Sequence, residues 1–138
     1  MSANRLIYLP LGGAGEIGMN SYVYGYGPAG KERLILVDLG VAFPDMDTSP
    51  GVDLILPDVS WLHDKLDRLE AIFITHAHED HIGALAPLWP QLEKKVYCRR
   101  FTATIGRLSN CPIVAPAYRK PKNASGWRKN SPMMRATA

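Results

Sequence analysis

The sequence has little of what marks a secreted, membrane-spanning or disulfide-stabilised protein. Its two cysteines, Cys98 and Cys111, have neither redox nor metal-ligand spacing. No apolar run approaches the ~18 residues that a membrane-spanning helix requires. The first residues also lack the small-residue cleavage site of a secretory signal. We therefore expect a protein of the reducing cytoplasm with no membrane association.

Acidic residues are almost absent from the last third of the chain. Residues 1–92 carry 5 Lys/Arg against 12 Asp/Glu, a net charge of −7, whereas residues 93–138 carry 11 Lys/Arg against one Glu, a net charge of +10. The hydrophobic periodicity ends at about residue 110, where four prolines and further basic residues follow. We expect an incomplete domain over 1–110 and a basic, irregular segment over 111–138.

Two explanations of this basic segment stay open. A disordered, solvated extension has this kind of composition. A change of reading frame also explains it. We favour this second explanation because the apolar pattern ends at a point where only about half of the expected sheet has been formed. The nucleotide sequence around codon 109 distinguishes the two, since a frame change predicts a second frame that continues with an acidic, histidine-containing domain.

Alternating strand-like and helix-like patterns predict the α/β class. Short apolar or β-branched runs bounded by Gly and Pro indicate strands at 6–9, 21–26, 33–38, 71–75 and 95–98. We expect the first three strands to be neighbours in a meander. Helix-like spacing indicates helices at 61–69, at 83–89, ending before Pro90, and at 101–108. Ser60 is a candidate cap of the first helix, and His63 within it has no predicted role.

Three of the four histidines fall within six consecutive positions. His76, His78, Asp80 and His81 form an H-x-H-x-D-H motif directly after the apolar run at 71–75. Residues two apart on an extended backbone point to the same side, so His76 and His78 can reach one metal ion together. Asp80 and His81 follow a turn of the chain and can face a second ion. Imidazole and carboxylate ligands suit zinc, with manganese or iron as alternatives.

The run from Thr75 to Gly83 resembles the signature of the metallo-β-lactamase superfamily, whose fold is an αββα sandwich with a dinuclear metal site at one edge. Within the superfamily it is similar to the ribonuclease J family of β-CASP-type RNA nucleases. Further segments at 11–20, 37–45 and 51–62 resemble that family in the same linear order. The likeness covers about residues 5–108, and it implies the first part of this sandwich, incomplete, followed by the basic segment.

The resemblance implies roles for five residues. His76 and His78 would bind one Zn²⁺, and Asp80 and His81 a second one, with Mn²⁺ as an alternative. Asp80 would also act in catalysis. Asp38 matches an Asp that orients the site through hydrogen bonds without touching the metal. From the residues alone, the interpretation that Asp38 only satisfies local backbone groups is nearly as well supported.

The implied activity is hydrolysis of RNA phosphodiester bonds by a metal-bound hydroxide, with RNA as the partner. No histidine follows His81 and no acidic residue follows Glu93, so the family's later ligands are missing and we expect this chain alone to be inactive. A homo-oligomer could supply further ligands. Two alternatives stay open: a thioesterase similar to glyoxalase II, although Ala84 stands where that family has a second glycine, and a non-catalytic remnant with weak metal binding.

Overall fold

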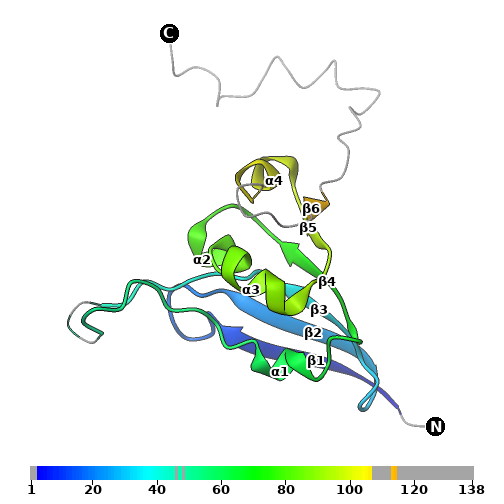
Figure 1. Ribbon diagram of the computed structural model, residues 1–138. Helices are drawn as coiled ribbons and strands as arrows, with labels where there is room; N and C mark the ends of the chain where they lie inside the picture. The colour runs from blue at the N-terminus through cyan, green and yellow to red at the C-terminus, as the bar shows by residue number, and fades with distance from the viewer. Residues whose placement is uncertain (1–2, 46, 48, 107–112, 115–138) are drawn as a thin grey trace, which may run out of the picture.

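One mixed sheet forms the centre of the computed structural model, which describes residues 3–45, 47, 49–106 and 113–114 (Figure 1). The strands lie in chain order, with β1–β2–β3 antiparallel and β3 to β6 parallel. They are β1 (Asn4–Gly12), β2 (Ser21–Pro28), β3 (Arg33–Val37), β4 (Leu69–Ile74), β5 (Val96–Cys98) and β6 (Ile113–Val114).

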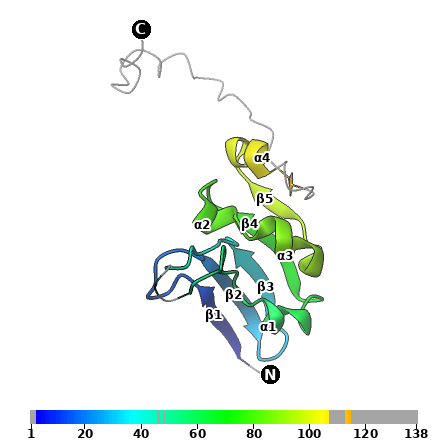
Figure 2. The ribbon, with the colours of Figure 1, turned by 60° about the vertical axis from the view of Figure 1, so that its left-hand side comes forward.

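Short helices lie over one face of this sheet. They are α1 (Ser60–His63), α2 (Glu79–Ile82) and α3 (Leu85–Leu92), while α4 (Arg100–Gly106) follows β5 at the end of the sheet (Figures 1 and 2). Alternate side chains of the strands, such as Leu36 and Ile72, are fully buried against Leu62 and Leu85 of the helices. None of the described helices combines the length and the apolarity needed to cross a membrane.

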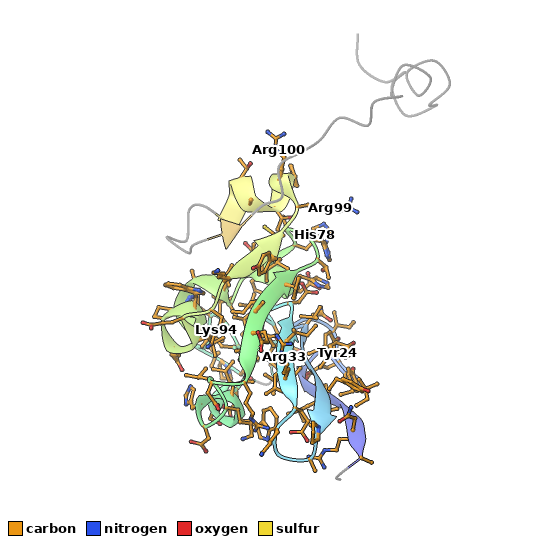
Figure 3. All side chains as sticks on the ribbon, turned by 90° about the vertical axis from the view of Figure 1, so that its right-hand side faces the viewer. Tyr24, Arg33, His78, Lys94, Arg99 and Arg100 are labelled. Carbon is orange, nitrogen blue, oxygen red and sulfur yellow. The ribbon has the colours of Figure 1, made fainter. Side chains whose placement is uncertain are left out.

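The opposite face of the sheet carries a band of aromatic side chains. The strand register places Tyr8 beside Tyr24, and Phe73 beside Tyr97, whose rings stack with centroids 5.3 Å apart. Tyr8 is 54% exposed, and no described helix covers this face. Figure 3 labels Tyr24 and Arg33 on these strands. The sheet is therefore half covered, as the resemblance to one part of a sandwich predicts.

The predicted strands and the antiparallel order of the first three are confirmed, but two predicted helices are wrong in extent. The helix expected over 61–69 ends at His63, and Ser60 does not cap it, because Ser60 is its first helical residue and Val59 stands at the N-cap position without a side-chain hydrogen bond. The helix expected to end before Pro90 contains that proline and continues to Leu92. Pro90 has no N–H to donate to the carbonyl four residues earlier, and α3 continues past it by only two residues.

Within the basic segment predicted for residues 111–138, the structure describes one short strand. Ile113 and Val114 pair with β5 in parallel and extend the sheet by one strand. Cys111 and the residues from 115 onward lie outside the described residues, so the boundary at residue 110 stays a prediction.

Glu32 is a carboxylate buried between three segments, with only 1% of its surface exposed. It accepts hydrogen bonds from Arg5 Nε at 2.5 Å, Arg68 Nη1 at 2.9 Å and the Gly30 backbone N–H at 3.0 Å. Together with the hydrogen bond from its own backbone N–H, the largest effect, these contacts lower the pKa of Glu32 from 4.5 to about 2. The ion pairs therefore connect β1, through Arg5, to the residues just before β4, through Arg68.

This burial predicts a defined pH dependence of stability. A carboxyl whose pKa is lower in the folded state stabilises the fold only while it is ionised. The free energy of unfolding should therefore fall as the pH drops from 4.5 toward about 2. Urea denaturation across this range, on the original chain and on Glu32→Gln, should show that the substitution reduces this slope. Glu70→Gln is the matched control, because its ion pair with Arg33 is exposed, and an equal loss of slope in both variants would contradict the assignment.

Candidate metal centre

The candidate ligands meet at one edge of the sheet because two parallel strands end there. Asp38 follows β3, and Thr75 to His78 follow β4, so the register that pairs Val37 with Phe73 brings both connections to the same edge. The short helix α2, which begins directly after His78, supplies Asp80 and His81. Figure 3 shows His78 toward the end of the molecule that carries α4, away from Arg33.

Asp38 is the centre of the hydrogen bonding at this edge. Its carboxylate is buried, and Oδ1 accepts hydrogen bonds from the backbone N–H of Thr75 at 2.7 Å and from Thr75 Oγ1 at 3.0 Å. Oδ2 lies 2.8 Å from His81 Nδ1. Its backbone has φ 62°, a left-handed conformation that costs a non-glycine residue free energy and that these contacts hold in place.

The Asp38 contact defines which nitrogen of His81 is available for a ligand. A carboxylate can only accept, so Nδ1 carries the proton and Nε2 keeps its lone pair. Nε2 lies 3.4 Å from Asp80 Oδ2 and 3.3 Å from Asn20 Nδ2. Protein histidines that bind metals commonly have this arrangement, with the far nitrogen donating to a carboxylate.

The rings of His76 and His78 continue the cluster from His81. The ring centroids of His76 and His81 are 4.0 Å apart, and those of His76 and His78 are 4.6 Å apart. His76 Nδ1 lies 3.0 Å from Thr75 Oγ1, which connects this ring to the same network. His63, which has no predicted role, lies elsewhere and contacts Gln91.

The four motif residues therefore gather at one place, and their chemistry fits a divalent metal. Imidazole nitrogens and a carboxylate oxygen are the ligands that zinc takes in proteins. Over the part of the chain that the structure describes, however, no three His, Cys, Asp or Glu side chains are arranged so that they could hold one ion. The four motif residues therefore gather at one edge without forming a three-ligand site among the described residues.

Asn20 belongs to this network, although its position in the sequence gave it no predicted role of its own. Its Nδ2 donates to Asp80 Oδ2 and to the Asp80 carbonyl, both at 3.1 Å, and its Oδ1 accepts the Tyr22 hydroxyl at 2.9 Å. Burial, with smaller contributions from Tyr8 and Asp38, raises the pKa of Tyr22, so this hydroxyl stays a donor. The available signal was a lone Asn between a glycine-rich turn and a strand.

Backbone hydrogen bonds hold α2 against the segment after β3. Leu39 N donates to the His81 carbonyl at 2.9 Å, Val41 N donates to the Glu79 carbonyl at 3.1 Å, and Asn20 N donates to the Asp80 carbonyl at 2.9 Å. This close approach requires glycine at position 40, because a Cβ there would lie 1.7 Å from the Asp80 carbonyl oxygen.

Comparison with known proteins identifies the class to which this edge site belongs. The model of the metallo-beta-lactamase superfamily matches residues 14–107, and the chain belongs to this superfamily. Membership implies the use of a divalent metal, in agreement with the donor types gathered around Asp38.

Curated relatives narrow the resemblance. The chain is 57% identical to ribonuclease J of Sinorhizobium meliloti over 99 residues, which are 72% of this chain and 17% of that protein. It is 40% identical to ribonuclease J 1 of Streptococcus pyogenes over 97 residues, 70% of this chain and 16% of that protein. The chain thus spans about a sixth of the length of these relatives.

Among solved structures, human tRNase Z, short form, matches over 82% of this chain and 44% of that chain, with 19% sequence identity and a TM-score of 0.38.

The close contact at Gly40 predicts a strongly destabilising substitution. Gly40→Ala should lower the free energy of unfolding by about 3 kcal/mol or more, because the new Cβ forces α2 away from the sheet edge. Gly51→Ala is the control: its φ is 80° but no atom lies within 4 Å of the added Cβ, so only about 1 kcal/mol of backbone strain is expected. Chemical denaturation measures both, and equal losses would contradict the packing of α2 on Gly40.

Proposed function

We propose that this chain is the N-terminal part of a metal-dependent ribonuclease of the ribonuclease J type. The observation that carries the proposal is the buried Asp38 carboxylate, which orients His81 so that Nε2 is directed toward Asp80, beside the two histidines after β4. The similarity to ribonuclease J covers the same residues. A structural role alone does not require three imidazoles and a carboxylate at one sheet edge.

The residues proposed to hold metal are His76 and His78 for one ion and Asp80 and His81 for a second. Zn²⁺ suits these donors, and Mn²⁺ is the alternative. Bound divalent ions would activate water and neutralise negative charge on the phosphoryl oxygens of RNA. The ligands found here do not complete either site, so the remaining ones would come from the rest of a longer protein or from a second copy of the chain.

The chain's own residues would orient the metal-binding side chains and keep the His81 proton on one nitrogen. Asp38 keeps the proton on His81 Nδ1 and fixes the plane of the ring, and Thr75 anchors Asp38 through two donors. Asn20 donates to the Asp80 carboxylate through Nδ2. These contacts orient the donors in advance, which lowers the cost of ordering them around an ion.

The RNA backbone would be gripped mainly outside this acidic part. Residues 1–92 carry a net charge of −7, which suits a metal centre and repels phosphates. Basic residues in the rest of a longer protein would supply the phosphate contacts. A cytoplasmic location, expected from the cysteine content, stays a prediction.

The proposal is tested with a longer protein in which this chain, up to Gly106, is joined to the remaining sequence of the Sinorhizobium meliloti relative. That protein should cleave 5′-monophosphorylated RNA, whereas the 138-residue chain alone should show negligible turnover. Asp80→Ala should lower kcat about 100-fold or more while RNA binding stays largely intact, because the carboxylate serves the metal and not the phosphate backbone. His76→Ala should behave similarly, with added loss of metal.

Asp64→Ala is the matched control, since Asp64 is an exposed carboxylate at the end of α1, and it should leave kcat unchanged. A glutathione thioester is tested beside the RNA. Hydrolysis of the thioester without cleavage of RNA would replace the ribonuclease by a thioesterase similar to glyoxalase II. Absence of both activities in the longer protein would favour a non-catalytic remnant.

A further inference from the structure

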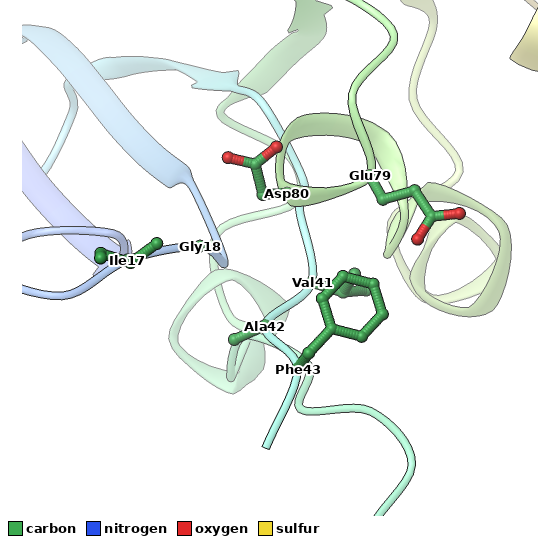
Figure 4. Close-up of a pocket in the computed structure, with 7 residues that line it drawn as sticks. All are labelled: Ile17, Gly18, Val41, Ala42, Phe43, Glu79 and Asp80. Carbon is green, nitrogen blue, oxygen red and sulfur yellow. The ribbon is translucent and has the colours of Figure 1, made fainter. Parts of the chain in front are cut away.

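The Asp80 carboxylate depends on one side chain for its orientation. Among the described residues, the only hydrogen bond donated to it comes from Asn20, whose Nδ2 lies 3.1 Å from Oδ2. His81 Nε2 lies 3.4 Å from the same oxygen but carries no proton to donate in the tautomer described above. Figure 4 shows the Asp80 carboxylate pointing away from Phe43 and Glu79. The position of this carboxylate therefore depends on how the Asn20 amide is turned.

The surroundings of the Asn20 amide select one of its two orientations. Nδ2 faces two oxygens that can only accept, Asp80 Oδ2 and the Asp80 backbone carbonyl, both at 3.1 Å. Oδ1 lies 2.9 Å from the Tyr22 hydroxyl. The reversed amide would direct its oxygen at the Asp80 carboxylate, where both groups are acceptors. Donation from Tyr22 to Oδ1 therefore favours the orientation in which Nδ2 holds Asp80.

Tyr22 reaches this amide from the aromatic face of the sheet. It pairs with Val37, the last residue of β3, and its ring stacks on Tyr8 with centroids 6.0 Å apart and planes at 18°. Burial raises the pKa of the Tyr22 hydroxyl, so the hydroxyl keeps its proton and can donate. Tyr24, two residues further along β2, also contacts Tyr8, but its hydroxyl has no hydrogen-bond partner among the described residues. Packing on Tyr8 is thus common to both tyrosines, whereas the contact to Asn20 belongs to Tyr22.

The glycine-rich turn before β2 closes over the contact between Tyr22 and Asn20. Gly13 has φ 79°, and a Cβ added there would lie 2.6 Å from the Tyr22 hydroxyl oxygen and 2.7 Å from Asn20 Oδ1. A side chain at position 13 would therefore push apart the two atoms that share the hydrogen bond. Gly15, in the same turn, has φ 84°, but a Cβ added there meets no atom within 4 Å. Both positions favour glycine through their backbone, and position 13 also requires it for the Tyr22 contact.

We propose that Tyr22 and Gly13 are positioning residues for Asp80. The Tyr22 hydroxyl, enclosed by the Gly13 backbone, fixes the Asn20 amide so that its nitrogen holds the Asp80 carboxylate beside His81. The proposal rests on the proposed role of Asp80 as a metal ligand of the ribonuclease. It gives the glycine-rich turn a function, and it connects the aromatic face of the sheet to the metal centre through residues that are not themselves candidate ligands.

The first test observes the Asn20 side-chain amide in the ¹H–¹⁵N NMR spectrum of the whole chain, without metal or RNA. Tyr22→Phe keeps the ring beside Tyr8 and removes only the donor. The Asn20 amide resonances should therefore shift, and their exchange with solvent should accelerate about fivefold, the factor that corresponds to one hydrogen bond of typical strength. Tyr24→Phe is the matched control and should leave the resonances and the exchange rate unchanged.

The second test measures the Kd of the whole chain for zinc in a double-mutant cycle. Asn20→Ala should raise this Kd about tenfold, the lower end of the loss seen when a group that orients a metal ligand is removed, and Tyr22→Phe should raise it about fivefold. Because Tyr22 acts through Asn20, Tyr22→Phe should add no further loss in the Asn20→Ala background. Gly13→Ala should behave like Tyr22→Phe, whereas Gly15→Ala should leave the Kd unchanged.

The outcomes separate this proposal from the proposed function. Unchanged Asn20 amide resonances in Tyr22→Phe, or equal changes in Tyr24→Phe, would overturn the positioning role and leave the ribonuclease proposal intact. Additive losses of zinc affinity in the double variant would also overturn it, because they would show that Tyr22 acts on general stability and not through Asn20. Absence of zinc binding by the original chain would instead overturn the ligand role of Asp80, on which both proposals rest.

Discussion

The hydrogen bond between the Asp38 carboxylate and His81 Nδ1, 2.8 Å long, is the contact on which the rest of the site depends. It joins the end of β3 to α2, although the two residues are 43 positions apart. It also fixes the tautomer of His81, so that Nε2 is directed toward Asp80. The left-handed backbone of Asp38 is part of this arrangement, because that conformation turns the carboxylate back toward Thr75 and α2.

The backbone around Gly40 holds α2 closely against the segment after β3. The backbone N–H groups of Leu39 and Val41 donate to the carbonyls of His81 and Glu79, and the backbone N–H of Asn20, from the turn before β2, donates to the Asp80 carbonyl between them. Asp80 is therefore held twice, because Asn20 donates to its backbone carbonyl while its carboxylate lies beside His81.

Sequence reasoning predicted the strands and the grouping of the motif residues because both follow from local patterns: apolar runs bounded by glycine, and two-residue spacing after a strand. It placed the end of the helix at 61–69 wrongly, because β-sheet pairing at Leu69 competes with helical spacing. The role of Asn20 could not be predicted, since its contacts to Asp80 span 60 positions.

The most direct test of this account is the ¹⁵N NMR spectrum of the His81 imidazole in the folded chain, recorded with and without added zinc. The account predicts a proton on Nδ1, held by Asp38, and an unprotonated Nε2 whose resonance shifts when zinc binds. In Asp38→Ala the preference for this tautomer should disappear. A proton found on Nε2 in the original chain, or an Nε2 resonance that zinc leaves unchanged, would contradict the assignment of His81 as a metal ligand oriented by Asp38.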